Sequence, residues 1–177
     1  MTLIDDVLGF WFEDPSRWWK KDPAFDAEVR AKFEALHDAI DRGAHESWLN
    51  TARGALAYVV VLDQFSRNMF RGTARMFASD ERALAAARRA LDRGDARALA
   101  ESERTFLAMP FMHSEDLVDQ DRSVAFFAAG PEDNRKFADQ HREIVRRFGR
   151  FPHRNAILGR TSTAEEIEFL RQPGSSF

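Results

Sequence analysis

The sequence predicts an all-α protein, and three observations lead to this prediction. Apolar residues recur at the spacing of one helical face in successive segments of the chain. Residues that cap or stop helices stand at the ends of these segments. No stretch alternates polar and apolar residues as a half-buried strand does, and the chain contains no Asn-Gly or Asp-Gly hairpin turn. We therefore expect helices joined by short loops.

The first two helices are defined by the residues at their ends. Thr2 can cap a helix that runs to a loop over residues 13–21. Asp22 followed by Pro23 is typical of an N-cap and a first helical residue, so a long second helix should begin there. Gly43 should end it. The apolar positions of this second helix share one face, and they are Phe25, Val29, Phe33, Leu36 and Ile40.

The central part of the chain predicts three more helices. A helix over residues 52–68 is apolar on most sides and should lie at the centre of the fold. Ser79 should begin the next helix, and Gly94 should end it. A further helix should begin at Ser102. Pro110 should end or kink that helix, because proline lacks the backbone N–H and its ring clashes with the preceding turn.

Three helices are expected in the C-terminal part. Ser114 can cap the first of them, and a second should cover residues 132–148. Thr163 and Glu166 have the spacing of a capping box, which should open the last helix.

Length and composition predict one domain. The chain has 177 residues, of which 44% are hydrophobic, so it can bury a core of its own. We expect a single helical domain over residues 1–172 and a short flexible C-terminal tail over residues 173–177. The segments AIDRG (39–43) and ALDRG (90–94) each end a predicted helix, which suggests stacked antiparallel helix pairs as in helical solenoids. Asp-Arg-Gly is also an ordinary helix ending, so chance similarity is the alternative.

Composition also limits the compartments and partners that we expect for this protein. The chain has no cysteine, which excludes disulfides, thiol catalysis and iron–sulfur clusters. Asp5 and Asp6 stand where a signal peptide needs positive charge, and the longest apolar run, residues 55–62, is too short to span a bilayer. A net charge of -3 does not fit the broad basic face of a nucleic-acid-binding protein. We expect a cytoplasmic protein with no membrane or nucleic-acid partner, and its oligomeric state stays open.

The segment over residues 141–160 is the most distinctive in the chain. It contains six arginines, two histidines and one glutamate within a mildly acidic protein. Because guanidinium groups match the geometry of carboxylates and phosphates, the segment predicts an anion-binding site. Alternatively, these arginines cap the C-termini of neighbouring helices. The residues that a turn around Gly149 and Pro152 would present are Arg150, His153, Arg154 and Asn155.

Further candidates come from two polar segments and one apolar helix face. In LDQFSRNMFRG, Gln64 and Arg67 share a polar flank of an apolar helix, although Arg67 can simply pair with Asp63 one turn away. In PFMHSEDLVDQ, a cap at Ser114 would place His113 before the helix and Glu115 in its first turn. A variant capping box is the alternative there. His141 lies in an apolar stripe and is a candidate ligand or base, and a satisfied core histidine is the alternative.

Motifs of higher specificity are missing from the sequence. There is no H-E-x-x-H metal motif, no Walker loop, no G-x-S-x-G elbow and no G-x-G-x-x-G turn. Side chains of metal-ligating type occur, but no two of them lie one helical turn apart. We therefore expect neither a metal nor a cofactor. The side chains of that type are His113, Glu115, His141 and His153.

Several motifs together resemble one uncharacterised bacterial family, the domain of unknown function nine-two-four. They are FWF near the start, WWKKDPAFD, LDQFSRNMFRG, PFMHSEDLVDQ and GRFPHRNAILGRTSTAEEIEFL. The resemblance covers nearly the whole chain and implies a helical fold similar to tetratricopeptide-repeat proteins. It implies no activity, substrate or catalytic residue. The chain lacks the W-x-x-L-G-x-x-Y pattern of true tetratricopeptide repeats.

The leading functional hypothesis is a polar histidine and arginine pocket that binds a small anionic ligand or a peptide carboxylate. One alternative is an enzyme in which His113 or His141 acts as general base, oriented by Glu115, with arginines holding an anionic substrate. The other is an interaction scaffold, in which the arginines form closed internal ion pairs and an apolar groove is exposed instead.

Overall fold

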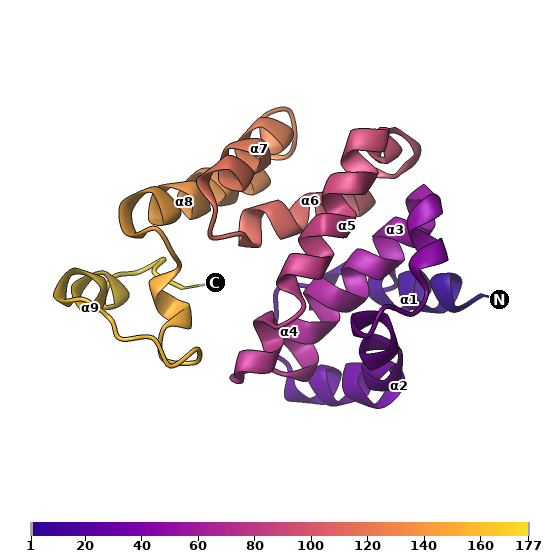
Figure 1. Cartoon of the computed structure of the whole chain (residues 1–177), viewed down its shortest axis with the longest axis horizontal. Coiled ribbons are helices and arrows are strands. Elements are labelled where there is room, and N and C mark those ends of the chain that lie inside the picture. The colour runs from indigo at the N-terminus through magenta and orange to yellow at the C-terminus, as the bar shows by residue number, and fades with distance from the viewer. Residues whose placement is uncertain (1, 177) are drawn as a thin grey trace. The chain divides into compact units, whose positions relative to one another are not determined.

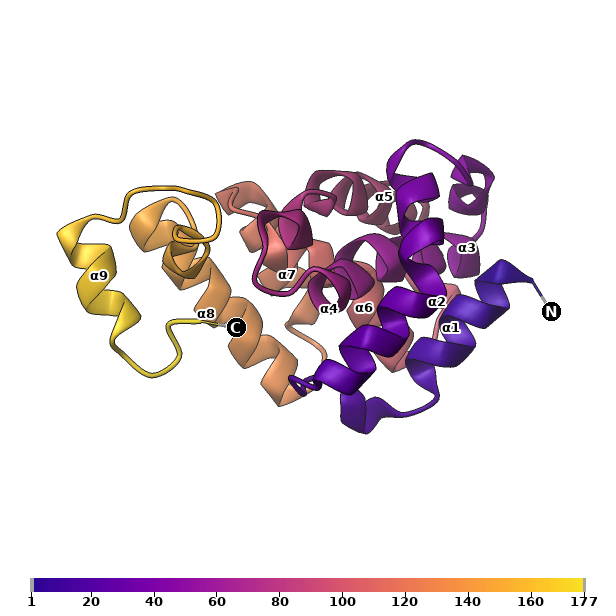
Figure 2. The same cartoon turned by 90° about the horizontal axis from the view of Figure 1, so that it is seen from below.

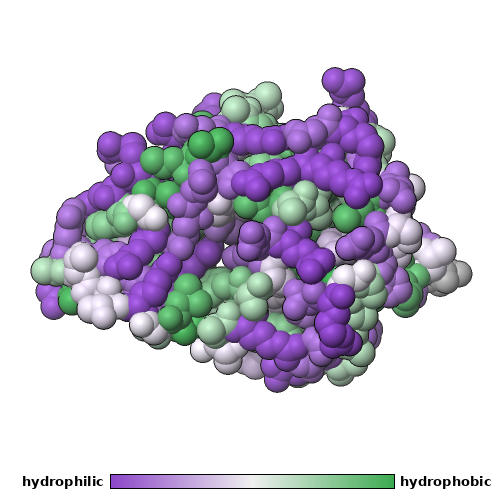
Figure 3. Space-filling view, viewed as in Figure 1, coloured by the Kyte–Doolittle hydropathy of each residue, from purple (hydrophilic) through white to green (hydrophobic). Residues whose placement is uncertain are grey.

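The computed structural model describes residues 2–176 and shows only helices and loops among them. The chain forms two compact units, and the domain expected over residues 1–172 spans both. Unit 1 consists of Met1–Arg71 and Arg75–Pro110, and unit 2 consists of Gly72–Ala74 and Phe111–Phe177. The all-α prediction is confirmed (Figure 1). Figure 3 shows that hydrophilic residues predominate on the face in view, with smaller hydrophobic areas between them.

Unit 1 begins with two helices whose predicted starts are confirmed. Its elements are α1 (Leu3–Phe12), α2 (Pro23–Asp41), α3 (Ala52–Val59), a π-helical segment (Val60–Phe65), α4 (Ser66–Met69), α5 (Asp80–Arg93) and most of α6 (Glu101–His113). Thr2 and Asp5 form a capping box at α1. The Asp22 carboxylate accepts hydrogen bonds from the backbone N–H groups of Ala24 and Phe25, with Pro23 at the first helical position.

The predicted central helix is confirmed, but it contains a π-helical turn that periodicity did not reveal. The helical path from Ala52 to Met69 is α-helical up to Val59, π-helical over Val60–Phe65, and α-helical again in α4. All side chains over residues 54–66 are buried, so this path is the core of unit 1. It packs against α2 and α5. An extra residue in the helical turn re-aims the side chains that follow it, and here those side chains are polar.

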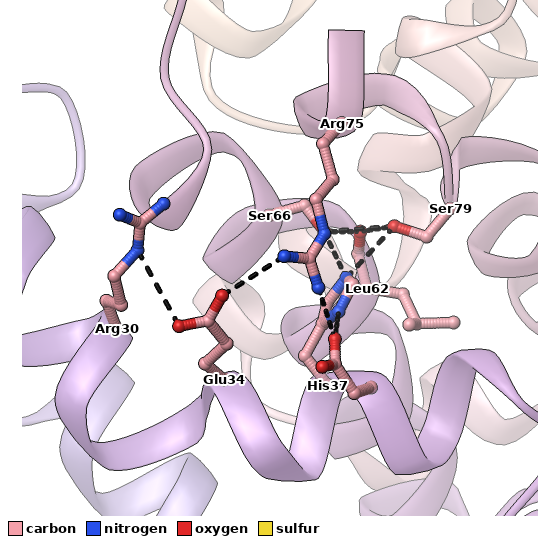
Figure 4. A network of polar contacts seen from close by, with 8 residues as sticks. Arg30, Glu34, His37, Leu62, Ser66, Arg75 and Ser79 are labelled. Atoms are coloured by element: carbon pink, nitrogen blue, oxygen red, sulfur yellow. Dashed lines mark hydrogen bonds and ion pairs between the residues drawn. The ribbon is translucent and has the colours of Figure 1, made fainter. Parts of the chain in front are cut away.

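One of these polar groups meets a buried histidine of α2 (Figure 4). His37 is 3% exposed, and its Nε2 atom lies 2.8 Å from the Ser66 hydroxyl and 3.3 Å from the Ser79 hydroxyl. Both hydroxyls donate to the Leu62 carbonyl oxygen, at 2.6 and 2.8 Å. Burial lowers the pKa of His37, so the neutral imidazole is favoured. Ser79 stands at the N-cap position of α5, as predicted, but its hydroxyl points into this network and caps nothing.

Gly54 allows α3 to begin close to the preceding turn. A Cβ atom at Gly54 would lie 2.2 Å from the Trp48 carbonyl oxygen, which is a backbone atom that cannot easily move. We expect Gly54→Ala to destabilise unit 1 by about 2 kcal/mol. The matched control is Gly9→Ala in α1, where a Cβ atom meets nothing within 4 Å. That change should stabilise the helix by about 0.5–1 kcal/mol. Urea titrations of both variants measure the change in the free energy of unfolding. Equal changes in the two variants would contradict this explanation of Gly54.

The two Asp-Arg-Gly endings have similar local structures. Gly43 follows α2 with a φ of 93°, and Gly94 follows α5 with a φ of 86°, both in the left-handed region that glycine adopts most readily. Each is followed by a short 3₁₀ turn, Glu46–Asn50 or Asp95–Ala98, and then by a helix. The chain order of helix, left-handed glycine, 3₁₀ turn and helix therefore occurs twice.

The first helix of unit 2 begins later than its sequence signals suggest. Asp116, not Ser114, is the N-cap, and its carboxylate accepts from the Val118 N–H. The Ser114 hydroxyl instead donates to the Asp119 carboxylate at 2.8 Å. Glu115 therefore lies in the loop before the helix rather than in its first turn. The helices of unit 2 are α7 (Leu117–Phe127), α8 (Glu132–Phe148) and α9 (Ala164–Leu170).

The helix that contains Pro110 is longer than expected. It begins at Glu101, one residue before the predicted start at Ser102, and it continues past Pro110 to His113. A proline can stay inside a helix when the turn around it adapts to the missing hydrogen bond. His113 is consequently the last helical residue of α6.

Helices α7 and α8 pack side by side in unit 2 (Figures 1 and 2). The predicted range of α8 is confirmed at both ends, and Gly149 ends it with a φ of 68°. Thr163 and Glu166 form the predicted capping box of α9. Residues 173–176 make contacts with these helices. Ser175 is 6% exposed and the Gln140 amide donates to the Gly174 carbonyl at 3.0 Å, while Phe177 lies outside the described residues.

Candidate functional site

Two histidines and one arginine lie around the ring of Phe151 in unit 2, and a third histidine lies beside one of them. Phe151 is fully buried, and its ring centroid lies 5.5 Å from that of His141 and 5.6 Å from that of His153. The Arg154 guanidinium lies over the same ring at 4.7 Å, and the His113 ring lies 6.4 Å from that of His141. We call His113, His141, His153 and Arg154 the imidazole cluster.

Helix α8 holds His141 as a neutral hydrogen-bonding group. The residue is 5% exposed, and its Nδ1 atom lies 2.7 Å from the Phe137 carbonyl oxygen one turn earlier. A carbonyl only accepts, so Nδ1 carries the proton and Nε2 is the acceptor atom. Burial lowers the pKa of His141 to about 3, and electrostatic repulsion from His113, His153 and Arg154 acts in the same direction.

Arg154 links the loop after α8 to the end of α6. Arg154 is only 7% exposed to solvent, and its Nη2 atom donates a hydrogen bond to the His113 carbonyl oxygen at 2.9 Å. The short 3₁₀ turn Pro152–Arg154 fixes this position, because Pro152 restricts the backbone at its first residue. His113 and His153 are half-buried, so the cluster has a buried part and a solvent-reachable part.

Glu115 is bound to an arginine and not to a histidine. The Arg160 guanidinium donates to both Glu115 carboxylate oxygens, at 2.7 and 2.9 Å, and the Phe151 N–H donates to one of them at 2.7 Å. Burial alone would raise the pKa of Glu115, but these donors together hold it below its usual value. The carboxylate therefore fixes the loop that carries Phe151 and does not orient an imidazole.

Arg150 is held in the same way by Glu166 of α9. The guanidinium donates to the two carboxylate oxygens at 2.6 and 2.8 Å and to the Thr161 carbonyl at 2.9 Å. This pairing, with the Thr163 N–H and the Asn155 amide, lowers the pKa of Glu166 to about 2. Asn155 also donates to the Ser162 hydroxyl at 3.0 Å. Arg150 and Asn155 thus connect the arginine-rich loop to α9.

Gln64 and Arg67 belong to unit 1 and form a separate polar group there. Arg67 donates to both oxygens of Asp80, at 2.8 and 3.0 Å, and lies 3.1 Å from an Asp63 carboxylate oxygen. Gln64 donates to the other Asp63 oxygen at 2.6 Å. Asp63 is fully buried. The sequence predicted the pair of Arg67 with Asp63 as an alternative, but it gave no signal for Asp80, which lies in α5.

Sequence reasoning also missed the parts that Phe151, Arg160 and Glu166 play. No role was predicted for Phe151 or Arg160, and Glu166 was interpreted only as half of a capping box. Their ion-pair and hydrogen-bond partners Arg150 and Glu115 lie 16 to 45 residues away along the chain, so no spacing rule within a helix connects them. Among residues 2–176, no three His, Asp or Glu side chains are arranged to hold a metal ion.

A family model for a bacterial protein of unknown function, DUF924, matches residues 7–174. The chain belongs to the DUF924 family. It is similar to a solved structure described as a protein of unknown function, ATU0120, from Agrobacterium tumefaciens. The two are 42% identical, with a TM-score of 0.92 over 95% of this chain and 96% of that one. A search of curated proteins gives no match.

The DUF924 assignment confirms the resemblance found from the sequence motifs, and the all-helical fold agrees with it. The matched range contains every candidate site residue of this chain. None of the helices formed by residues 2–176 is both long and apolar enough to cross a bilayer.

Proposed function

We propose that this DUF924 protein binds a small anionic ligand or a peptide carboxylate at the imidazole cluster of unit 2. One observation supports the proposal above the others. The rings of His141 and His153 and the Arg154 guanidinium gather around Phe151, and the His113 ring lies beside that of His141. Arg154 is always a cation and the imidazoles can donate hydrogen bonds, so the cluster offers the charge and the donors that an anion needs.

The proposed site is smaller than the set of residues that the sequence suggested. Arg67 and Arg150 each donate to two oxygens of an internal carboxylate, and removing either from its partner would leave a buried charge behind. Gln64 lies in unit 1, and Glu115 and Asn155 pair with Arg160 and Ser162 rather than with a member of the imidazole cluster. In this proposal the ligand contacts His113, His153 and Arg154, and the other candidates shape the units that carry the site.

Each member of the cluster has a distinct part in binding. The half-buried imidazoles of His113 and His153 meet the ligand from solvent. Arg154 supplies a forked guanidinium that is already fixed over Phe151, so little side-chain entropy is lost on binding. His141 is a buried neutral imidazole beside them, and its NMR signals would report the arrival of a ligand at its neighbours.

The general-base alternative has less support than simple binding. It needs Glu115 to orient a histidine, but Glu115 accepts from Arg160 and from the Phe151 N–H. A histidine with a pKa of about 3 is also a weak base at neutral pH, because proton abstraction is most efficient when the pKa is close to the working pH.

The proposal is tested by titrating inorganic phosphate and N-acetylglycine into the full chain and following the imidazole signals by NMR. We expect saturable shifts for His113, His141 and His153 with a dissociation constant on the order of 1 mM or tighter. His153→Gln should weaken binding at least several-fold, because glutamine cannot become a cation, while its similar size keeps the core closed.

The matched control is His45→Asn in unit 1. His45 has a φ of 61°, a conformation that asparagine tolerates, so the fold should be kept. This variant should bind like the wild type. Shifts that are linear in anion concentration, or that are the same in His153→Gln, would contradict the proposed site.

A further inference from the structure

Unit 1 carries a groove between α1 and α2 whose floor is apolar. Its volume is about 800 Å³. Figure 2 shows α1 and α2 side by side, and the Phe10 and Phe33 rings meet between them at 5.1 Å. The residues that line the groove are Asp5, Asp6, Gly9, Phe10, Phe12, Glu13, Lys32 and Phe33.

Gly9 has no conformational or packing reason to be glycine. It lies within α1, without the positive φ that would favour glycine, and a Cβ atom there would enter open space. Glycine is disfavoured inside helices because it loses more conformational freedom than other residues on folding. Gly9 lines the groove beside Phe10, so a bulky side chain such as leucine at this position would project into it.

Two acids flank this opening on the same face of α1. Asp6 and Glu13 are exposed, and among the described residues neither carboxylate has a hydrogen bond or an ion pair. They are seven residues apart, which is about two helical turns or 10 Å along the axis. Gly9 and Phe10 lie between them on that face.

The remaining charges of the groove are already paired within the chain. Asp5 lies 3.4 Å from the Arg53 guanidinium. The Lys32 ammonium lies 3.1 Å from Glu28 and sits over the Phe10 ring at 4.7 Å. The net field of the groove therefore comes from Asp6 and Glu13 and is negative.

We propose that this groove docks an amphipathic helix of a partner protein with two basic residues seven positions apart. Apolar side chains three and four positions after the first basic residue would pack over Gly9 and Phe10. The basic residues would then face Asp6 and Glu13, so the partner repeats the spacing of α1 with the opposite charge. This inference concerns unit 1 and does not depend on anion binding in unit 2.

The test uses a labelled, acetylated and amidated alanine-based helical peptide that contains K-A-A-L-L-A-A-K, and the full-length protein. Fluorescence anisotropy should show saturable binding, and the same peptide with Glu in place of both Lys should not bind. Combining Asp6→Asn with Glu13→Gln should weaken binding about tenfold. Gly9→Leu should weaken it by about tenfold as well, without lowering the thermal midpoint, because leucine favours the helix.

The matched control combines Glu81→Gln with Asp139→Asn, two exposed acids outside the groove, and removes the same charge. It should leave the affinity unchanged. The proposal is overturned if the peptide fails to bind, if the Glu peptide binds equally, or if Gly9→Leu has no effect. Self-association that Gly9→Leu abolishes would also overturn it, since the occupant would then be a second copy of the chain.

Discussion

Arg67→Met should lower the free energy of unfolding of unit 1 by about 3–5 kcal/mol, because it leaves a buried carboxylate without its cation. Arg67 lies 3.1 Å from a carboxylate oxygen of Asp63, which is fully buried, and donates to both oxygens of Asp80. Burial opposes the charge of Arg67, but the two carboxylates outweigh it and raise its pKa. Urea titration followed by tryptophan fluorescence measures the loss, since all four tryptophans lie in unit 1.

The matched control for this variant is Arg53→Met. Arg53 also lies near two carboxylates, Asp5 and Glu103, but its side chain is 56% exposed. An exposed ion pair contributes about 0–1 kcal/mol, so this change should have a small effect. If the two variants lose similar amounts of unfolding free energy, burial of the Asp63 carboxylate does not make the Arg67 ion pairs more important than exposed ones.

Arg150→Met should destabilise unit 2 by about 3 kcal/mol at neutral pH, and the loss should shrink in acid. Glu166 is 2% exposed and accepts two hydrogen bonds from Arg150, which lower its pKa to about 2. A carboxylate with a lowered folded pKa stabilises the fold above its unfolded pKa of about 4.3. That contribution is lost as the pH falls through about 2.

The difference between wild type and Arg150→Met should therefore be constant above about pH 5 and decrease between about pH 4 and pH 2. Unit 2 contains no tryptophan, so amide NMR signals of α8 and α9 should be followed in urea titrations at each pH. Arg171→Met is the control, because Arg171 and its partner Glu168 are 71% and 66% exposed. A difference that stays constant or grows towards acid would show that Glu166 is not the group involved.

Helix boundaries marked by strong local signals were the features that local sequence determined best. The Asp22-Pro23 pair, the capping box of Thr163 and Glu166, and the glycines after α2, α5 and α8 all have the predicted roles. Each of these signals acts within one helical turn. Ser114 failed as a cap because a second candidate, Asp116, lies two residues later, and the Ser114 hydroxyl has a partner in Asp119.

The sequence by itself determined the all-α class, most helix ends and the segments in which polar residues gather. Only the tertiary structure decided what those residues contact. Arg67 meets Asp80, Glu115 meets Arg160, and Arg150 meets Glu166, and these partners are 13 to 45 residues apart in the sequence. Helix signals are local because they depend on hydrogen bonds and side-chain spacing within a turn. Ion pairs between segments depend on how whole helices pack against one another. The sequence spacing of the paired residues does not determine that packing.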